Sequence, residues 1–336
     1  MAEAAGARLE SLPITAAGPG EEELAIDVAW LGSQRPQKVL LHSSGLHGVE
    51  AFAGSAIQLQ LLETPPVLDT TTALILVHVL NPYGMAWLRR FNENNVDLNR
   101  NFLNTSKGES YRGSPEGYAV LDALLNPSRL PWLDVFALKA GWLILRHGLS
   151  TLEQAIVSGQ YDYPEGLFFG GSELQEGPRL YKDFLERELA GAERIFAIDV
   201  HTGLGPFGED TVLVAEENFA RLRAALGERV EAFSTSDDNV AYEIRGGLHE
   251  MLPRLLGAVQ VDFVGQEFGT FGQVRVLGAL RKENFAHHHR APSMEDPFKQ
   301  DLRDAFYPDD EEWREKVLGR GRELFEQGLR LLSDGS

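Results

Sequence analysis

Cysteine is absent from this chain of 336 residues. Disulfide bonds and thiolate zinc sites are therefore both excluded, and any metal ion must be held by histidine and carboxylate side chains. Long apolar runs are also missing: the most apolar stretch, 135–145, is interrupted by Lys139 and is too short to span a bilayer. Residues 1–13 contain no continuous apolar stretch of the kind found in a secretory signal. We therefore expect a soluble, cytoplasmic protein without a membrane partner.

Positive charge is scarce as well. The 50 acidic residues outnumber the 31 basic ones, so the formal net charge is −19. Phosphate binding needs a basic surface, and the excess of acid argues against nucleic acid as a partner. The same excess keeps a protein soluble and gives a weak bias toward neutral or cationic substrates. Nothing in the sequence indicates an oligomeric state.

Apolar segments of strand length alternate with helical patterns along the chain. Strands are expected over 24–31, 38–43, 73–80, 194–200, 211–215 and 259–264, and helices over 51–62, 174–189 and 309–332. This alternation predicts an α/β fold, with a mostly parallel mixed sheet flanked by helices. Because internal repeats and low-complexity linkers are absent, we expect one domain over 1–336. A helical insertion is expected at about 105–190, and a C-terminal helix at about 309–332.

Three separate segments, 47–50, 97–102 and 199–203, carry the residues expected of a metal site. A hydrolytic zinc ion typically has three protein ligands and leaves the fourth position to water. His47, Glu50 and His201 supply two imidazoles and one carboxylate. His47 and Glu50 are three residues apart and can reach one ion from a single turn, whereas His201 comes from a separate strand end. A His-x-x-Glu pair is a weak signal by itself and gains weight from the other two segments.

Asn99 and Arg100 are the candidates for binding a substrate carboxylate. The guanidinium group can make two parallel hydrogen bonds to a carboxylate, and the asparagine amide can add a third. A buried salt bridge would explain Arg100 alone, but not the polar residues that surround it in the segment 95–101. Arg89 or Arg90, just upstream, could place a cation near a developing oxyanion. The sequence leaves open which of the two does so.

Two further carboxylates have roles that their positions suggest. Asp199 precedes His201 by two residues, so both side chains lie on the same face of a strand and the carboxylate could orient the imidazole. A capping or turn role is the alternative. Glu267 follows the apolar segment 259–264. A carboxyl group between apolar neighbours at a strand end should have a raised pKa and suits a general base, although a buried structural role is also possible.

At these residues the chain resembles the zinc carboxypeptidase superfamily, which includes the aspartoacylase and succinylglutamate desuccinylase enzymes. The resemblance depends on the segments 47–50, 81–84 and 96–102 together with His201. The segments 43–50 and 159–161 resemble an uncharacterised bacterial branch of that superfamily. The combination of motifs is specific for the superfamily, but it is not specific for a substrate.

The resemblance implies one zinc ion per chain and hydrolysis by a promoted water molecule, with Glu267 as the catalytic glutamate. Members of the superfamily often place a mobile tyrosine over the site. Tyr242 lies in the expected stretch between His201 and Glu267, and Tyr161 and Tyr163 are rivals for this role.

Three functions are compatible with these residues. The first is hydrolysis of an amide or peptide bond next to a free carboxylate, in a peptide or a small molecule. The second is deacylation of N-acyl amino acids, as in an amidohydrolase of the aspartoacylase type. The third is a catalytically silent protein that keeps the carboxylate pocket. The run His287-His288-His289 is expected at a surface turn or the rim of a site, because consecutive side chains point in different directions.

Overall fold

The computed structural model describes residues 1–115, 117–130, 135–148, 152, 154, 156, 158–233 and 244–333. It contains one eight-stranded sheet with the strand order β1-β2-β4-β3-β5-β8-β6-β7. The strands are β1 (Arg8–Ala17), β2 (Glu23–Gly32), β3 (Lys38–Ser44), β4 (Thr72–His78), β5 (Arg194–Gly203), β6 (Asp210–Val214), β7 (Val230–Ala232) and β8 (Gln260–Gly269). The longer helices are α1 (Ala51–Glu63), α3 (Tyr118–Leu125), α4 (Phe136–His147), α6 (Glu176–Leu189), α7 (Glu216–Leu226), α8 (Leu248–Leu255), α9 (Gln273–His289), α10 (Pro297–Phe306) and α11 (Glu311–Ser333).

The four central strands, β4, β3, β5 and β8, are parallel to one another. Antiparallel pairs, β2 with β4 and β6 with β8, extend the sheet on its two sides. The predicted α/β fold with a mostly parallel mixed sheet is therefore confirmed. The sequence did not predict β1 or β7, which form the two edges. Only Leu12 of β1 is buried, so this strand lacks an apolar pattern, and β7 has three residues.

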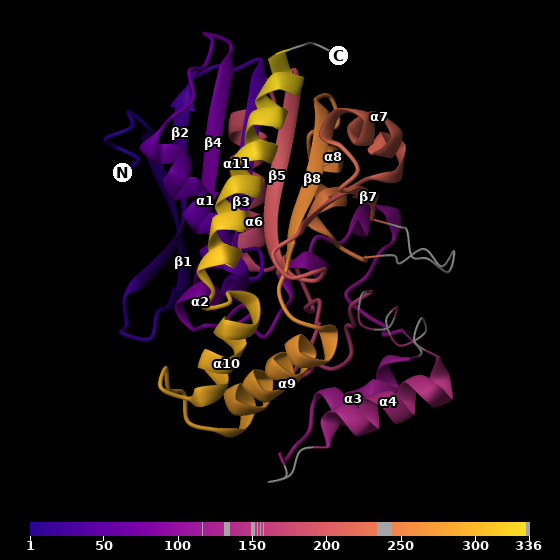
Figure 1. The fold of residues 1–336 in the computed structure, drawn as a ribbon. Helices are drawn as coiled ribbons and strands as arrows, with labels where there is room; N and C mark the ends of the chain where they lie inside the picture. The colour runs from indigo at the N-terminus through magenta and orange to yellow at the C-terminus, as the bar shows by residue number, and fades with distance from the viewer. Residues whose placement is uncertain are drawn as a thin grey trace.

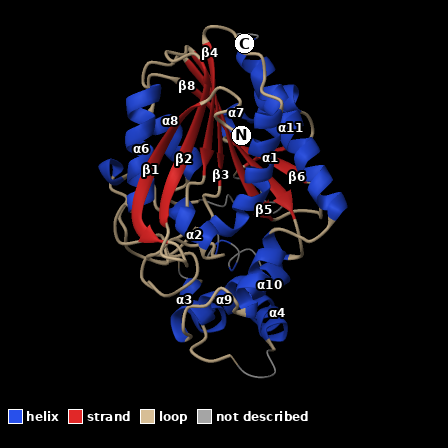
Figure 2. Cartoon of the chain, turned by 90° about the vertical axis from the view of Figure 1, so that its left-hand side faces the viewer, coloured by secondary structure: helices blue, strands red, loops and turns tan. Residues whose placement is uncertain are grey.

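Helices cover both faces of the sheet. Side chains alternate along β5: Ile195 and Ala197 belong to the core on one face, and Phe196 and Ile198 to the core on the other. Helices α6 and α8 pack on the first face, whereas α1, α7 and α11 pack on the second, as Figure 2 shows. Strand β3 is buried on both faces in the same way, which explains its continuous apolar sequence.

A third apolar core lies at one end of the sheet. It is built from α3, α4, α9 and α10, which lie together below the strands in Figures 1 and 2. Val49, a few residues after β3, and Phe306, at the end of α10, both belong to this core. Helices α3, α4 and α6 fall in the range of the expected insertion, but the division of the chain into domains stays a prediction. Among the described helices, none is long and apolar enough to cross a membrane.

Candidate metal centre and active site

The turn after β3 holds His47 and Glu50. It consists of a loop and the short helix η1 (Gly48–Glu50), which leads directly into α1. Its backbone is fixed by the neighbouring segment, because the N–H groups of Gly48 and Val49 donate to the carbonyls of Arg90 and Arg89. Gly48 allows a close approach that no other residue would: a Cβ atom there would lie 2.1 Å from the carbonyl carbon of Gly84. The turn is thus clamped between two backbone segments.

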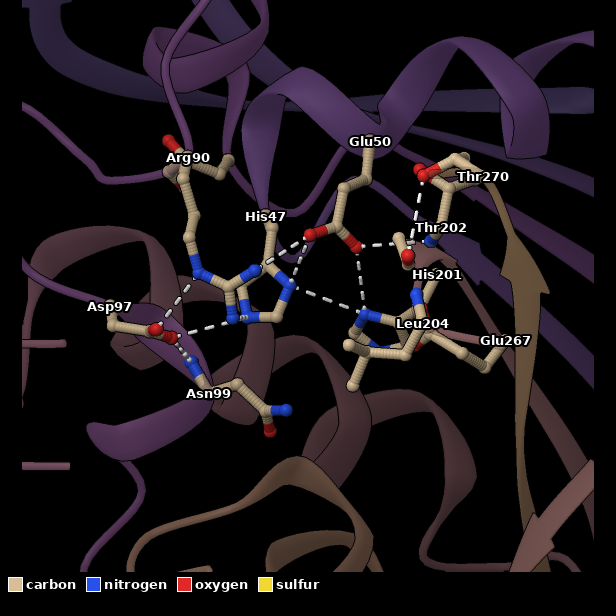
Figure 3. A network of polar contacts seen from close by, with 12 residues as sticks. His47, Glu50, Arg90, Asp97, Asn99, His201, Thr202, Leu204, Glu267 and Thr270 are labelled. Atoms are coloured by element: carbon tan, nitrogen blue, oxygen red, sulfur yellow. Dashed lines mark hydrogen bonds and ion pairs between the residues drawn. The ribbon is translucent and has the colours of Figure 1, made fainter. Parts of the chain in front are cut away.

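His47, Glu50 and His201 converge on one point. Nδ1 of His47 lies 3.0 Å from Oε1 of Glu50, and Nδ1 of His201 lies 3.2 Å from Oε2 of the same carboxylate. The two Nδ1 atoms are 3.3 Å apart (Figure 3). Among the described residues, these three form the one group of His, Asp and Glu side chains whose possible ligand atoms are close enough to share an ion.

A carboxylate lies behind each imidazole. Asp199 Oδ2 is 2.7 Å from His201 Nε2, and Asp97 Oδ1 is 3.1 Å from His47 Nε2. Ser43 in turn donates to Asp199 at 2.6 Å, between register partners of β3 and β5. Such carboxylate–histidine pairs fix the ring orientation and direct the Nδ1 lone pair forward. Asp199 lies in contact with His201, as its spacing of two residues along β5 predicts, whereas the matching contact of His47 with Asp97 was not predicted. The signal for Asp97 was its place in the same short run as Asn99 and Arg100.

The donor set fits a divalent cation. Burial raises the pKa of Glu50, but His47, His201 and Arg90 outweigh it and hold that pKa well below its usual range. For Asp97 burial is likewise outweighed by Arg90 and His47, so its pKa is also well below the ordinary value. Both carboxylates are therefore ionised, and the two inward-facing nitrogens and Glu50 offer three ligand atoms in a buried pocket. This combination of imidazole and carboxylate is typical of zinc.

Arg90 lies inside this cluster, whereas Arg89 does not. The Arg90 side chain donates to Glu50 at 2.7 Å and to Asp97 at 3.1 Å. Its Nη2 is also 2.8 Å from His47 Nε2. That nitrogen cannot both donate to Asp97 and accept from Arg90, so only one of these contacts is a hydrogen bond at a time. When Nδ1 holds a cation, the proton is on Nε2 and the Asp97 contact is the hydrogen bond.

Arg89, the other arginine candidate from the sequence, contacts a different part of the molecule. Its fully buried guanidinium points to Glu283 of α9, at 2.9 Å, and to Asn95, at 2.8 Å. Lys299 of α10 reaches the same Glu283 oxygen at 3.3 Å. Consecutive residues point in different directions, so placing Arg90 in the cluster turns Arg89 toward α9 and α10.

Glu267 faces the same cluster from β8. It is the register partner of His201 on β5, and its Oε1 accepts a hydrogen bond from the backbone N–H of Leu204 at 2.9 Å. Burial and the negative charge of Glu50 raise the pKa of Glu267 to about 7. A carboxyl group with such a pKa exchanges protons readily near neutral pH.

Asn99 and Arg100 lie on another side of the same cavity. The Arg100 side chain is buried and donates to the Asn99 carbonyl at 2.8 Å, but among the described residues it has no carboxylate partner within ion-pair distance. Its Nε is buried without a hydrogen-bond partner in that part of the chain. The Asn99 side chain accepts from the N–H of Leu248 at 3.1 Å. Arg100 is thus a buried cation that lines the cavity, and no carboxylate in the described part of the chain lies within ion-pair distance of it.

Two of the three tyrosine candidates from the sequence lie among the described residues. Tyr242 lies outside the described residues. Tyr161 is buried, and its hydroxyl donates to the Arg100 carbonyl at 2.7 Å, so it supports the segment that carries Arg100. Tyr163 packs against the Tyr118 ring, with 5.2 Å between centroids. Neither described tyrosine is among the side chains that line the cavity.

The cavity has a volume of about 420 Å³. Its lining combines the polar residues described above with mostly apolar side chains. Its walls come from Ile156 and Phe168, from α8 and from α9, together with strands β6 and β8. The walls also include His249, which sequence reasoning did not select. This ring stacks on Phe233 at 4.2 Å, and burial lowers its pKa to about 4, so it is neutral at physiological pH.

Comparison with known proteins gives one family and a set of distant structural likenesses. A search of curated proteins found no match. One similar solved structure is a metallopeptidase-like protein from Shewanella amazonensis SB2B, at 18% identity over 87% of this chain and 90% of that one, with a TM-score of 0.43. Another is carboxypeptidase A from Helicoverpa armigera, at 13% identity over 95% of this chain and 69% of that one, with a TM-score of 0.44.

A third is a succinylglutamate desuccinylase from Silicibacter sp. TM1040, at 16% identity over 85% of this chain and 70% of that one, with a TM-score of 0.40. The matched structures thus include both groups that the sequence motifs predict. Because the TM-scores are below 0.5, these likenesses carry no argument about the activity of this chain. The family profile described as "Protein of unknown function (DUF2817)" matches residues 1–320. The chain therefore belongs to that family.

Proposed function

We propose that this protein is a zinc-dependent hydrolase that cleaves an amide or peptide bond next to a free carboxylate. The observation that carries the proposal is the buried convergence of His47 Nδ1, Glu50 and His201 Nδ1, with each imidazole held from behind by a carboxylate. These three residues would hold one zinc ion. Without thiolates in the chain, two imidazoles and one carboxylate form the donor set expected of a hydrolytic zinc site.

Zinc bound there would supply a Lewis acid that polarises a carbonyl group and makes water more acidic. Glu267 is the proposed general base, since its pKa of about 7 lets it take a proton from water and return it to a leaving amine at neutral pH. Arg90 adds a positive charge beside Glu50, where it would stabilise negative charge on a substrate oxygen.

Arg100 and Asn99 are the proposed site for the substrate carboxylate. A buried guanidinium without a carboxylate partner among the described residues is costly unless an anion binds it. Burial lowers the pKa of Arg100 and outweighs the charge of Asp97, which raises it, and Arg90 lowers it further, so the charged form lacks full compensation. A substrate carboxylate would supply the missing charge and could be bound in the two-pronged geometry that arginine favours.

A second candidate is deacylation of N-acyl amino acids. It is favoured by the apolar part of the cavity lining, to which Ile156 and Phe168 contribute together with Val276 and Leu280 of α9. These apolar walls limit the room for a long peptide and suit a short or apolar acyl group. Both candidates share the metal, the base and the carboxylate site.

The first experiment is the zinc content of the purified protein beside the variants His47→Ala and Glu267→Gln. We expect about one zinc ion per chain in the wild type, its loss in His47→Ala and its retention in Glu267→Gln. Retention is expected because Glu267 contacts the Leu204 N–H and not the ligand atoms. A wild-type protein that takes up no metal after zinc is supplied would refute the hydrolase and leave the carboxylate-binding protein.

The zinc-loaded protein is then tested on two substrate series with the same carboxyl-terminal residue. One series consists of N-acyl amino acids and the other of peptides of increasing length. Rapid cleavage of long peptides would exclude the deacylase, whereas cleavage of N-acyl amino acids alone would select it.

A further inference from the structure

The most apolar stretch of the sequence forms an exposed helix. Helix α4 covers most of 135–145, yet only two of its side chains, Phe136 and Leu143, are buried. Leu138, Trp142 and Leu145 are 75%, 55% and 87% exposed. A helix of a soluble protein usually turns one apolar stripe to the core and a polar face to water, so a second apolar stripe needs an explanation.

The exposed side chains form a stripe of their own. Phe136, Ala140 and Leu143 follow the helical spacing of four and three residues and pack into the third core, against α3 and α9. Leu138, Trp142 and Leu145 repeat the same spacing two residues later, which is about 200° around the helix. The outer stripe therefore points away from the protein. Figure 1 shows α4 at the periphery of the molecule, away from the sheet.

The outer stripe has a basic border. Lys139 and Arg146, seven residues apart, lie along one side of it, and the sequence 136–147 contains no acidic residue. The Arg146 guanidinium lies over the Trp142 ring, 5.2 Å from its centroid. In a chain with a net charge of −19, helices α3, α4, α9 and α10 together carry seven basic residues and four acidic ones. These four helices thus carry a small excess of positive charge, in contrast to the chain as a whole.

We propose that the outer stripe of α4, with Lys139 and Arg146, docks on an anionic lipid surface. Helices that lie on membranes combine leucine and tryptophan on one side with lysine and arginine beside them. Charge complementarity selects this occupant over a second copy of the chain. An antiparallel two-fold contact between two α4 helices would bring the cations of one copy beside those of the other. A single helix of 12 residues also offers little surface compared with the roughly 1,200 Å² that stable protein interfaces bury.

The helix that carries the outer stripe is connected to the cavity through helix α9. Phe136 lies against Gly278 of α9, with 3.7 Å between its ring and the position of a Cβ there, and the Arg281 guanidinium lies over the same ring at 5.2 Å. Helix α9 also supplies Val276 and Leu280 to the cavity wall. A protein docked through α4 would therefore hold one wall of the cavity near the lipid surface. The docking itself does not depend on the proposed hydrolysis.

The test is flotation of the full chain with vesicles of phosphatidylcholine alone and of phosphatidylcholine mixed with phosphatidylglycerol. We expect binding to the mixed vesicles, little to the neutral ones, and weaker binding at high salt. Each cation near the surface contributes about fivefold to binding, so K139Q/R146Q should bind about 25-fold more weakly. The matched control R35Q/R112Q removes two exposed cations elsewhere and should bind like the wild type.

The contribution of the three apolar side chains of the outer stripe is tested with the variant L138S/W142S/L145S. The control is Leu59→Ser, which changes another exposed leucine. The triple variant should lose binding and keep its melting temperature, because its side chains are exposed. If it does not fold, Leu145→Ser alone should weaken binding. Equal binding to neutral and mixed vesicles, or none to either, would overturn the proposal. A wild-type dimer that the triple variant abolishes would assign the stripe to self-association instead.

Discussion

His201 on β5 and Glu267 on β8 are register partners in adjacent parallel strands. They are 66 residues apart in the sequence, yet the backbone hydrogen bonds of the sheet fix their separation, and both side chains project from the same face. Glu50 approaches the pair from the turn after β3 and raises the pKa of Glu267. A proposed ligand and the proposed base are thus held by the most rigid part of the fold, which is where precise geometry is easiest to maintain.

The pKa of Glu267 predicts how activity depends on pH. Glu267 acts as a base only when ionised, and its pKa is raised to about 7. The value of kcat/KM should therefore fall tenfold per pH unit below about 7 and level off above it. Glu267→Gln should lower kcat by a factor of about 10² to 10⁴ and lose this acidic limb. A Glu267→Gln variant with the wild-type pH profile would show that another group is the base.

Asp199 should affect zinc affinity more than stability. In Asp199→Asn the side chain can still contact Ser43 and His201, but it no longer carries the charge that favours the correct imidazole tautomer. Loss of such a partner typically weakens metal binding by about 10-fold to 100-fold. Competition with a chromogenic chelator measures the change, and Asp97→Asn should show a similar one through His47. Unchanged affinity in both variants would mean that the carboxylates have only a structural role.

Arg100 should make the protein prefer a substrate with a free carboxylate over the same substrate without one. Replacing the carboxylate of a good substrate by a carboxamide should lower kcat/KM by about tenfold to a hundredfold, the usual value for hydrogen bonds to a charged group. In Arg100→Met, activity on the carboxylate substrate should fall by a similar factor, and the two substrates should become nearly equal. If the variant still prefers the carboxylate, another cation binds it.

Arg89 and Arg90 should behave differently, although they are neighbours. Arg89→Met leaves Glu283 with Lys299 as its remaining cation partner among the described residues, so the free energy of unfolding should fall by about 3 kcal/mol while kcat per folded molecule is kept. Arg90→Met should lower kcat by a factor of about 10² to 10³. Urea unfolding and steady-state kinetics separate the two effects. A large loss of kcat in Arg89→Met at unchanged stability would indicate that Arg89 takes part in catalysis.

The sequence by itself determined the kinds of residue in the candidate site and the strand ends that carry them. His47, Glu50, His201 and Glu267 follow apolar segments, and the carboxyl ends of parallel strands meet at one edge of a sheet. The pattern of apolar segments also predicted the central strands, because buried strands must be apolar on both faces. Such features depend on local sequence, so they can be read before the chain folds.

Only the tertiary structure decided which of two adjacent arginines faces the candidate metal ligands. Local sequence is nearly the same for Arg89 and Arg90, and the choice depends on Glu283 of α9, nearly 200 residues away. The role of Asp97 behind His47 likewise depends on a contact between separate segments. The edge strand β1 was missed because a strand with one neighbour needs little apolar sequence.

The stretch 135–145 shows that the sequence alone also leaves open which apolar side chains are exposed. Its composition is that of a core segment, and the sequence alone could not tell that half of it points outward. Burial is decided by what packs against a helix, and the apolar core that α4 joins in the described structure lies on one side of it. Local chemistry thus determined what each segment could do, whereas long-range packing decided which side chains are placed to do it.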